Sequence, residues 1–123
     1  MVGQRLTKRI EESGVEVAVT IITVEEQMRG WLAEIGRHAD PRRQISAYAK
    51  LHRQFEVFAD WMILQLDAAS ADLFLNLRRQ GVRIGSMDLK IACIALVHNA
   101  ALASRNSRDF AQVPGLRLEN WLD

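Results

Sequence analysis

The order of hydrophobic and polar positions divides the chain into short apolar runs and longer stretches with a helical period. Short apolar runs at 15–23, 61–66 and 101–104 predict strands, and 116–122 predicts a last short strand or extended tail. The first of them, VEVAVTIIT, is rich in β-branched residues and almost continuously apolar. Such a run is typical of a strand that is buried on both faces.

Between these runs, apolar residues recur every three or four positions and predict helices. The expected helices span residues 4–13, 24–35, 44–60, 68–81 and 87–98, with connections over 38–43 and 81–86. Gly14 and Gly81 stand where the first and fourth helices should end. Strands that alternate with helices predict an α/β layer fold with a mostly parallel sheet. We expect a single domain over residues 1–123.

The helix expected over 44–60 carries a stripe of apolar side chains: Tyr48, Leu51, Phe55 and Phe58. Core packing is the simplest role for such a stripe. The alternative is a surface that receives a helix of a partner protein.

Composition limits the classes of protein that the chain can belong to. Hydrophobic residues make up 49% and charged residues 25% of the chain, as in an average globular protein. A net charge of +1 gives no electrostatic case for a large nucleic-acid footprint. Cys93, the only cysteine, lies in an apolar run and is expected to be buried. No apolar signal or membrane span is apparent, so we expect a cytoplasmic protein with no membrane partner.

Acidic residues that directly follow predicted strands or extended segments are the candidate chemistry. In open α/β sheets, ligands bind beyond the carboxyl ends of the strands, and Glu25, Glu26, Asp67, Asp88 and Asp109 occupy such positions. Each has a structural alternative: Asp67 suits a helix N-cap, and the helix dipole favours acids in a first turn. Against this alternative, Asp88 opens an almost wholly apolar helix, where a carboxylate without a partner is costly.

Helical geometry separates the two adjacent glutamates. Glu26 shares a face with Gly30 and Ala33, small residues that could lie close against other backbone, whereas Glu25 lies nearer Arg29. We therefore favour Glu26. Carboxylates gathered from separate loops persist only with protons or cations between them, and oxygen ligands without His or Cys suit magnesium or manganese. The residues alone leave two functions open: a metal-dependent phosphodiesterase-type site and a plain α/β binding domain.

Two segments resemble parts of the PIN-domain nucleases. TIITVEEQMRG (20–30) resembles the family's strand and helix in which a Glu stands four residues before a Gly, here Glu26. IGSMDLKIACIAL (84–96) resembles the segment in which an Asp opens an Ala-rich helix, here Asp88.

A third segment, LASRNSRDF (102–110), resembles the family's T-x-N-x-x-D-F strand end, with Ser104 in place of Thr. Together with LDAASADLFLNLRRQG (66–81), the matches cover almost the whole chain in the family's order. The nearest likeness is to the toxin-like branch of bacterial toxin–antitoxin pairs.

The resemblance implies a three-layer α/β/α fold and an endoribonuclease that depends on Mg²⁺ or Mn²⁺. The implied metal-binding and catalytic acids are Glu26, Asp88 and Asp109, with Asn106 as a further catalytic side chain. Asn106 and Ser104 would position Asp109 or a water on the ion. Ser104 and Arg105 would bind the substrate. The implied partners are an RNA substrate and an antitoxin protein.

The sequence departs from the family pattern near its start. The family begins with a strand that ends in a motif of the type L-D-T-N, whose Asp is the first metal ligand, and nothing here resembles it. We therefore expect the central N-terminal strand to be missing, and the metal site to be one carboxylate short. Nuclease activity should then be weak or absent. An unpaired sheet edge at 15–23 would favour a homo-oligomer.

Two further functions remain open. The first is a non-catalytic remnant of the fold that binds a protein, such as an antitoxin-like helix, through the stripe on 44–60. The second is an unrelated α/β signalling domain with an acidic pocket. An acidic cluster without the Asn106–Asp109 arrangement near it would favour this function.

Overall fold

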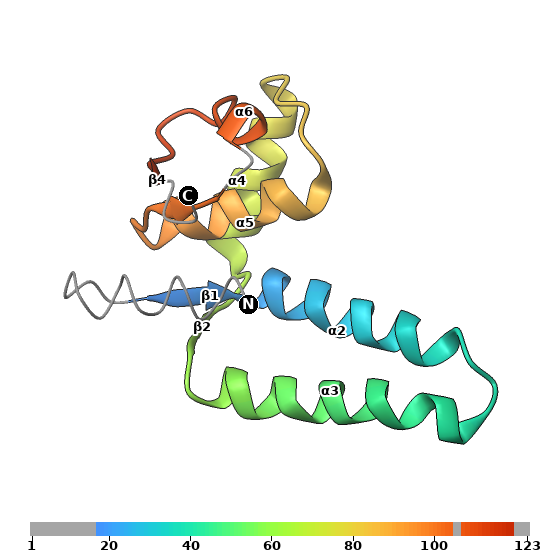
Figure 1. The fold of residues 1–123 in the computed structure, drawn as a ribbon. Helices are drawn as coiled ribbons and strands as arrows, with labels where there is room; N and C mark the ends of the chain where they lie inside the picture. The colour runs from blue at the N-terminus through green and yellow to red at the C-terminus, as the bar shows by residue number, and fades with distance from the viewer. Residues whose placement is uncertain (1–16, 105–106, 120–123) are drawn as a thin grey trace. The chain divides into compact units, whose positions relative to one another are not determined.

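The fold is described from a computed structural model, which defines residues 17–104 and 107–119 (Figure 1). Its elements in chain order are β1 (Ala18–Thr20), α2 (Ile21–Gly36), α3 (Pro41–Ala59), β2 (Met62–Leu64), α4 (Ala68–Arg79), α5 (Ser86–Val97), β3 (Leu102–Ala103), α6 (Ser107–Phe110) and β4 (Leu118–Glu119). The chain forms two compact units. We call Ala18–Leu64 the hairpin unit and the described residues from Gln65 onward the main unit.

The hairpin unit consists of one strand pair and two long helices. β1 and β2 are parallel, with Ala18 opposite Met62 and Thr20 opposite Leu64. Helices α2 and α3 run in opposite directions and pack along their length (Figure 1). Gln44 fixes the connection between them, because its amide nitrogen donates to the carbonyl oxygens of Ile35 at 3.1 Å and His38 at 2.6 Å.

The first strand is shorter than the sequence predicts. It ends at Thr20, whose backbone is extended and whose hydroxyl oxygen accepts a hydrogen bond from the Thr23 N–H at 3.1 Å. This N-cap begins α2 at Ile21, so the end of the β-branched run is helical. The strand prediction for 21–23 is therefore wrong. Residues 15 and 16, and the helix predicted over 4–13, lie outside the described residues.

Helix α3 likewise begins earlier than predicted. Asp40 is its N-cap and accepts from the Arg42 N–H at 3.0 Å, while Pro41 takes the first helical position. Proline is favoured there because its missing N–H would have no partner in the helix. The connection predicted over 38–43 thus ends at residue 40.

The main unit is built around α5. Leu89, Ala92, Cys93 and Ile94 of this helix are fully buried, as the apolar sequence predicts. The core cluster comprises Leu77, Val82, Ile84, Leu89, Ala92, Cys93, Phe110 and Val113. β3 and β4 form a second parallel pair, with Leu102 opposite Leu118.

Helices α4 and α5 end in the same backbone motif. After α4, the Val82 N–H donates to the Leu77 carbonyl and the Gly81 N–H to the Arg78 carbonyl, both at 3.1 Å, with Gly81 at φ +93°. The pattern is a Schellman motif, which needs a left-handed residue after the cap. Asn99, at φ +53°, fills that position after α5.

The predicted α/β class with parallel strands is confirmed, and most of the described residues are helical. Within the described ranges, the strands form two separate pairs and residues 81–86 form no strand. The predicted strands at 61–66 and 101–104 shorten to β2 and β3, and the short helix α6 was not predicted. In the part of the chain that is described, no helix is both long and apolar enough to cross a membrane.

Candidate functional site

Asp88 lies in the first turn of α5, the helix at the centre of the main unit. It is half-buried, and the next residue, Leu89, is fully buried. The N-cap of this helix, Gly85, offers no side-chain hydrogen bond to the helix. The helix dipole favours an acid at this position. Half-burial also means that the carboxylate needs neighbouring protons, donors or cations.

Asp109 lies in α6 and is also half-buried. Phe110, the residue after it, is 4% exposed and belongs to the same core cluster as Leu89. Each of these two acids thus directly precedes a residue of one packed core. Their backbones are held by the same unit.

The loop before Asp109 is described only in part. Ser104 is half-buried at the end of β3, and its N–H donates to the Glu119 carbonyl oxygen at 3.2 Å. Arg105 and Asn106 lie outside the described residues, so the roles expected of both remain predictions.

Glu26 lies on α2 in the hairpin unit and is exposed. Its neighbour Glu25 forms an ion pair with Arg29 at 2.5 Å, as the helical geometry predicts. A Cβ at Gly30 would meet no atom within 4 Å, and Ala33 is exposed. The described residues therefore do not place packed backbone on this face, and the choice of Glu26 remains a prediction.

Asp67 has the structural role that was its alternative. It is the N-cap of α4 and accepts hydrogen bonds from the Ser70 hydroxyl at 2.7 Å and the Ser70 N–H at 2.9 Å. These two bonds favour the charged form and hold the pKa of the Asp67 carboxyl below its ordinary value of 3.8. The cap accounts for the position of Asp67, so the residue needs no ligand.

Burial excludes the thiol of Cys93 as a catalytic nucleophile. Cys93 has no exposed surface, and burial raises the pKa of its thiol to about 11. The thiolate, which is the reactive form, is therefore almost absent at neutral pH.

The chemistry of the candidate donors fits a hard divalent cation. Asp88, Asp109 and Glu26 offer carboxylate oxygens, which are ligands that magnesium and manganese accept. Over residues 17–104 and 107–119, no three side chains of His, Cys, Asp or Glu form a group that could hold a metal ion. Two of the acids lie in one unit and the third in the other. Their assembly into one site therefore stays a prediction.

Arg78 is a residue that the sequence does not single out. Its guanidinium donates to the Val82 carbonyl oxygen at 2.9 Å and to the Ser86 hydroxyl at 3.4 Å. It also lies 5.1 Å from the centre of the Phe74 ring. These contacts fix the connection from α4 to α5, two residues before Asp88. Nothing in the spacing of the sequence reveals an arginine that reaches forward in this way.

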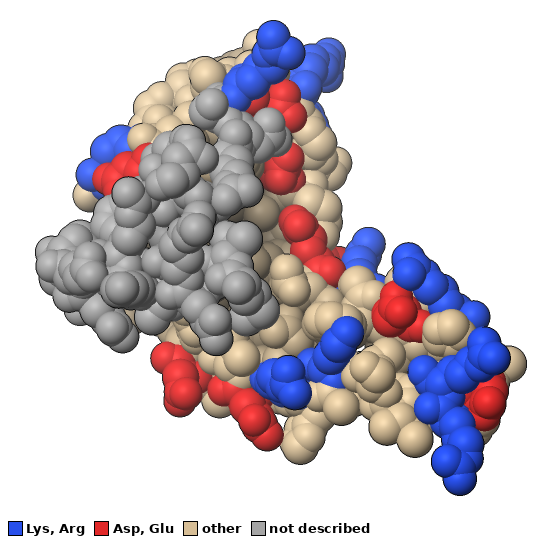
Figure 2. Space-filling model, viewed as in Figure 1, with Lys and Arg blue, Asp and Glu red and all other residues tan. Residues whose placement is uncertain are grey.

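Within the hairpin unit, positive charge is concentrated on helix α3. Helix α3 contains four Arg and Lys residues and one Glu, a formal net charge of +3, whereas the whole chain has +1. Lys and Arg side chains gather over the end of the hairpin that holds the α2–α3 connection (Figure 2). The low net charge of the chain thus conceals a basic helix.

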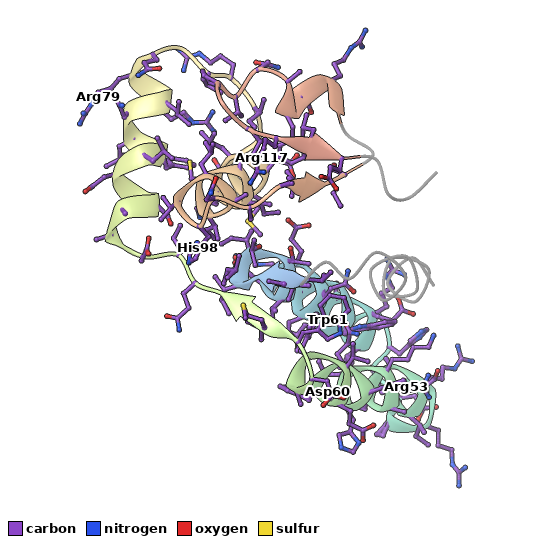
Figure 3. The ribbon with its side chains drawn as sticks, turned by 90° about the vertical axis from the view of Figure 1, so that its left-hand side faces the viewer. Arg53, Asp60, Trp61, Arg79, His98 and Arg117 are labelled. Atoms are coloured by element: carbon purple, nitrogen blue, oxygen red, sulfur yellow. The ribbon has the colours of Figure 1, made fainter. Side chains whose placement is uncertain are left out.

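A second arginine closes the connection after α5. Arg117 donates to the Asn99 carbonyl oxygen at 2.6 Å, and the ring Nδ1 of His98 lies 2.9 Å from the Ile94 carbonyl oxygen (Figure 3). These contacts stabilise the end of α5 at the opposite end of the helix from Asp88.

Comparison with protein families and with individual proteins is consistent with this geometry. Residues 3–116 match the PIN domain. Ribonuclease VapC2 of Haemophilus influenzae is 30% identical over 121 residues, which cover 95% of this chain and 84% of that protein. Ribonuclease VapC2 of Rickettsia felis is 42% identical over 50 residues, but that match spans only 41% of this chain and 37% of the relative's length.

A solved structure has the same fold. VapBC-1 from nontypeable Haemophilus influenzae matches with a TM-score of 0.71 over 98% of this chain and 87% of that chain. The sequence identity is 20%, so this likeness concerns the fold alone.

Proposed function

Because the chain belongs to the PIN domain family, we propose that it is a toxin-type endoribonuclease that hydrolyses RNA phosphodiester bonds with a divalent metal ion. The relatives' name, ribonuclease, supports the substrate class. Family membership also removes the case for an unrelated α/β signalling domain.

In this proposal, Asp88, Asp109 and Glu26 hold Mg²⁺ or Mn²⁺. Such an ion supplies an activated water and stabilises the charge that develops on the scissile phosphate. Ser104 and Asn106 position Asp109. Arg105 binds a phosphate of the RNA and, with Ser104, keeps the strand in place.

The observation that carries the proposal is the setting of Asp88 and Asp109. Both are half-buried, and both directly precede buried residues of one core cluster, Leu89 and Phe110. Carboxylates on so fixed a backbone lose little freedom when they bind an ion. This is the preorganisation that electrostatic catalysis requires.

The proposal includes two protein partners. The first is an antitoxin, which the likeness to the solved structure of VapBC-1 supports. The second is another copy of the chain, so that the active form is a homo-oligomer.

The test replaces each acid by its amide. Asp88→Asn and Asp109→Asn should each lower RNA cleavage in Mg²⁺ or Mn²⁺ by about a hundredfold or more, because each removes charge that stabilises the transition state. Both variants should also weaken Mn²⁺ binding, measured by electron paramagnetic resonance. The second measurement is needed because the 123 residues contain no L-D-T-N-like motif, so we expect weak cleavage or none.

Asp72→Asn is the matched control, since Asp72 is an exposed acid on α4 that the proposal does not use. It should change neither cleavage nor Mn²⁺ binding. Cleavage that persists unchanged in Asp88→Asn and Asp109→Asn, or in the presence of EDTA, would contradict the assignment.

A second function is favoured by one observation: Tyr48 and Phe55 of the stripe on α3 are 54% and 60% exposed. Leu51 and Phe58 of the same stripe are half-buried, so only part of it is available. The chain would then be a non-catalytic PIN domain that binds a protein partner. Retained binding of a co-expressed antitoxin, without Mn²⁺ binding, would favour this function.

A further inference from the structure

Arg78, in the last turn of α4, makes contacts that reach forward to the start of α5. One nitrogen of its guanidinium donates to the Val82 carbonyl oxygen at 2.9 Å, and the other makes a longer bond to the Ser86 hydroxyl at 3.4 Å. The same group lies 5.1 Å from the centre of the Phe74 ring, one turn earlier on α4. The half-buried arginine is therefore held by two hydrogen bonds and by a ring against the guanidinium.

The turn that Arg78 reaches lies between two buried anchors. Ile84 is 6% exposed and Leu89 has no exposed surface, whereas Gly85 and Ser86, which follow Ile84, are exposed. Gly85, the N-cap of α5, makes no side-chain hydrogen bond to the helix. The Leu89 N–H donates to the Gly85 carbonyl oxygen at 2.9 Å and so closes the first turn. This turn has buried side chains only at its ends, and Arg78 holds it between them.

Asp88 is the candidate metal ligand that depends on this turn. It is half-buried in the first turn of α5 and stands two residues after Ser86. A shift of the turn carries the Asp88 carboxylate with it, because both residues belong to one turn of helix. A carboxylate that binds an ion has to be held within about 0.5 Å of its productive position. The hydrogen bonds of Arg78 restrict such a shift.

We infer that Arg78 is a positioning residue for Asp88: through the Val82 carbonyl and the Ser86 hydroxyl it holds the first turn of α5 in the orientation that Asp88 needs to bind the metal ion. The inference rests on the proposed function, which assigns the ion to Asp88, and deepens it with a residue outside the set of acids. Arginine suits this role because its planar fork offers donors in two directions, whereas the donors of lysine lie on one atom.

The order of the turn can be measured without metal or RNA. Amide hydrogen exchange at Leu89, followed by NMR on the full chain, reports how often the first turn of α5 opens. Arg78→Met keeps an apolar stem but removes both hydrogen bonds. It should speed exchange at Leu89 roughly tenfold or more, because hydrogen bonds to charged groups are the stronger ones. Ser86→Ala leaves the bond to Val82 and should speed exchange less.

A double-mutant cycle tests whether Arg78 acts through Asp88. Mn²⁺ affinity is measured by electron paramagnetic resonance for the unmodified chain, Arg78→Met, Asp88→Asn and the double variant. Arg78→Met should weaken Mn²⁺ binding roughly tenfold, as when a group that orients a metal ligand is removed. It should change nothing further in the Asp88→Asn background, because the carboxylate that it positions is already gone. In an Asp109→Asn background the loss should persist.

Arg79→Met is the matched control. Arg79 is the next residue of α4, is exposed and points away from the helix (Figure 3). This variant removes the same charge from the same end of α4, and it should leave the exchange rate and the Mn²⁺ affinity within about twofold of the unmodified values. Arg78→Lys keeps the charge and should restore only part of both values. Circular dichroism checks that the variants keep their helices, and Ser86→Ala repeats the test if Arg78→Met does not.

Equal exchange at Leu89 in Arg78→Met and Arg79→Met would overturn the inference, since Arg78 would then not hold the turn. Faster exchange with unchanged Mn²⁺ affinity would also overturn it, as would an equal loss of affinity in the Asp88→Asn background, because Arg78 would then only stabilise the unit. Mn²⁺ binding that needs Asp88 but not Arg78 refutes the inference alone. An unmodified chain that binds no Mn²⁺ refutes the proposed function, and the inference with it.

Discussion

Asp67 and Asp88 open neighbouring helices of the main unit, but their carboxylates have different settings. Asp67 is a cap, with both hydrogen bonds from Ser70, and the D-x-x-S spacing makes that role readable from the sequence. Asp88 lies inside its helix and is half-buried. Its apolar helix marks it in the sequence, whereas the support of the preceding connection by Arg78 becomes visible only in the structure.

The cap predicts a difference in acid sensitivity. The pKa of Asp67 is lower in the folded chain than in the unfolded chain, so the charged carboxylate stabilises the fold above about pH 3.8. This contribution is lost as the pH falls through the lowered value. Asp67→Asn should keep the cap and lose this pH dependence, because an amide also caps but does not titrate. Thermal unfolding from about pH 6 to about pH 3 measures the effect.

Two further variants test the same cap. Asp67→Ala should lower the melting temperature at neutral pH, and Ser70→Ala should lower it less, because the Ser70 N–H can still donate. Equal pH dependence in the unmodified protein and Asp67→Asn would show that the cap does not set the acid sensitivity.

At the scale of elements, the sequence patterns predict the presence of the helices more accurately than the residues at which the helices begin and end. The β-branched run VTIIT predicts a strand to residue 23, but Thr20 caps α2, and the packing of α2 on α3 overrides the preference of Ile21 and Ile22. Gly81 marks the end of α4 correctly. The end of α5 carries no glycine, since Asn99 takes the left-handed position instead.

Two glycines with open space around them should respond to alanine in opposite ways. A Cβ at Gly81 or Gly30 would meet no atom within 4 Å. Gly81→Ala should nevertheless destabilise the protein by about 1 kcal/mol, because φ +93° is strained for alanine. Gly30→Ala should stabilise it by up to about 1 kcal/mol, because alanine favours the helix interior. Urea denaturation gives both values, and a like sign for the two variants would contradict this account.

At the scale of the whole molecule, the α/β class and the order of the longer helices follow from the sequence, but the division into two units does not. From the sequence, the long connection from β1 to β2 predicts two more helices of the same layer. Periodicity shows which face of a helix is apolar, but it does not show which element packs against that face. For the same reason, the candidate acids could be named individually, whereas their assembly depends on contacts between distant parts of the chain.

Strand pairing predicts self-association. Within the described residues, β1 and β2 pair only with each other, so each has an edge with no strand beside it. Exposed edges favour pairing with another chain. We expect the purified protein to form a dimer or larger homo-oligomer, detected by light scattering after size exclusion. A single monomeric species over a wide range of concentrations would contradict this expectation.

The parallel pairing of β1 and β2 also has a mechanical consequence. The chain enters the hairpin unit through β1 and leaves it through β2, with Ala18 opposite Met62 and Thr20 opposite Leu64. Tension applied along the chain at Val17 and Gln65 would therefore pull two parallel neighbours in opposite directions. The hydrogen bonds between them would be loaded together, in shear, rather than broken one after another. The two helices between the strands would bear force only after the pairing of β1 with β2 had broken.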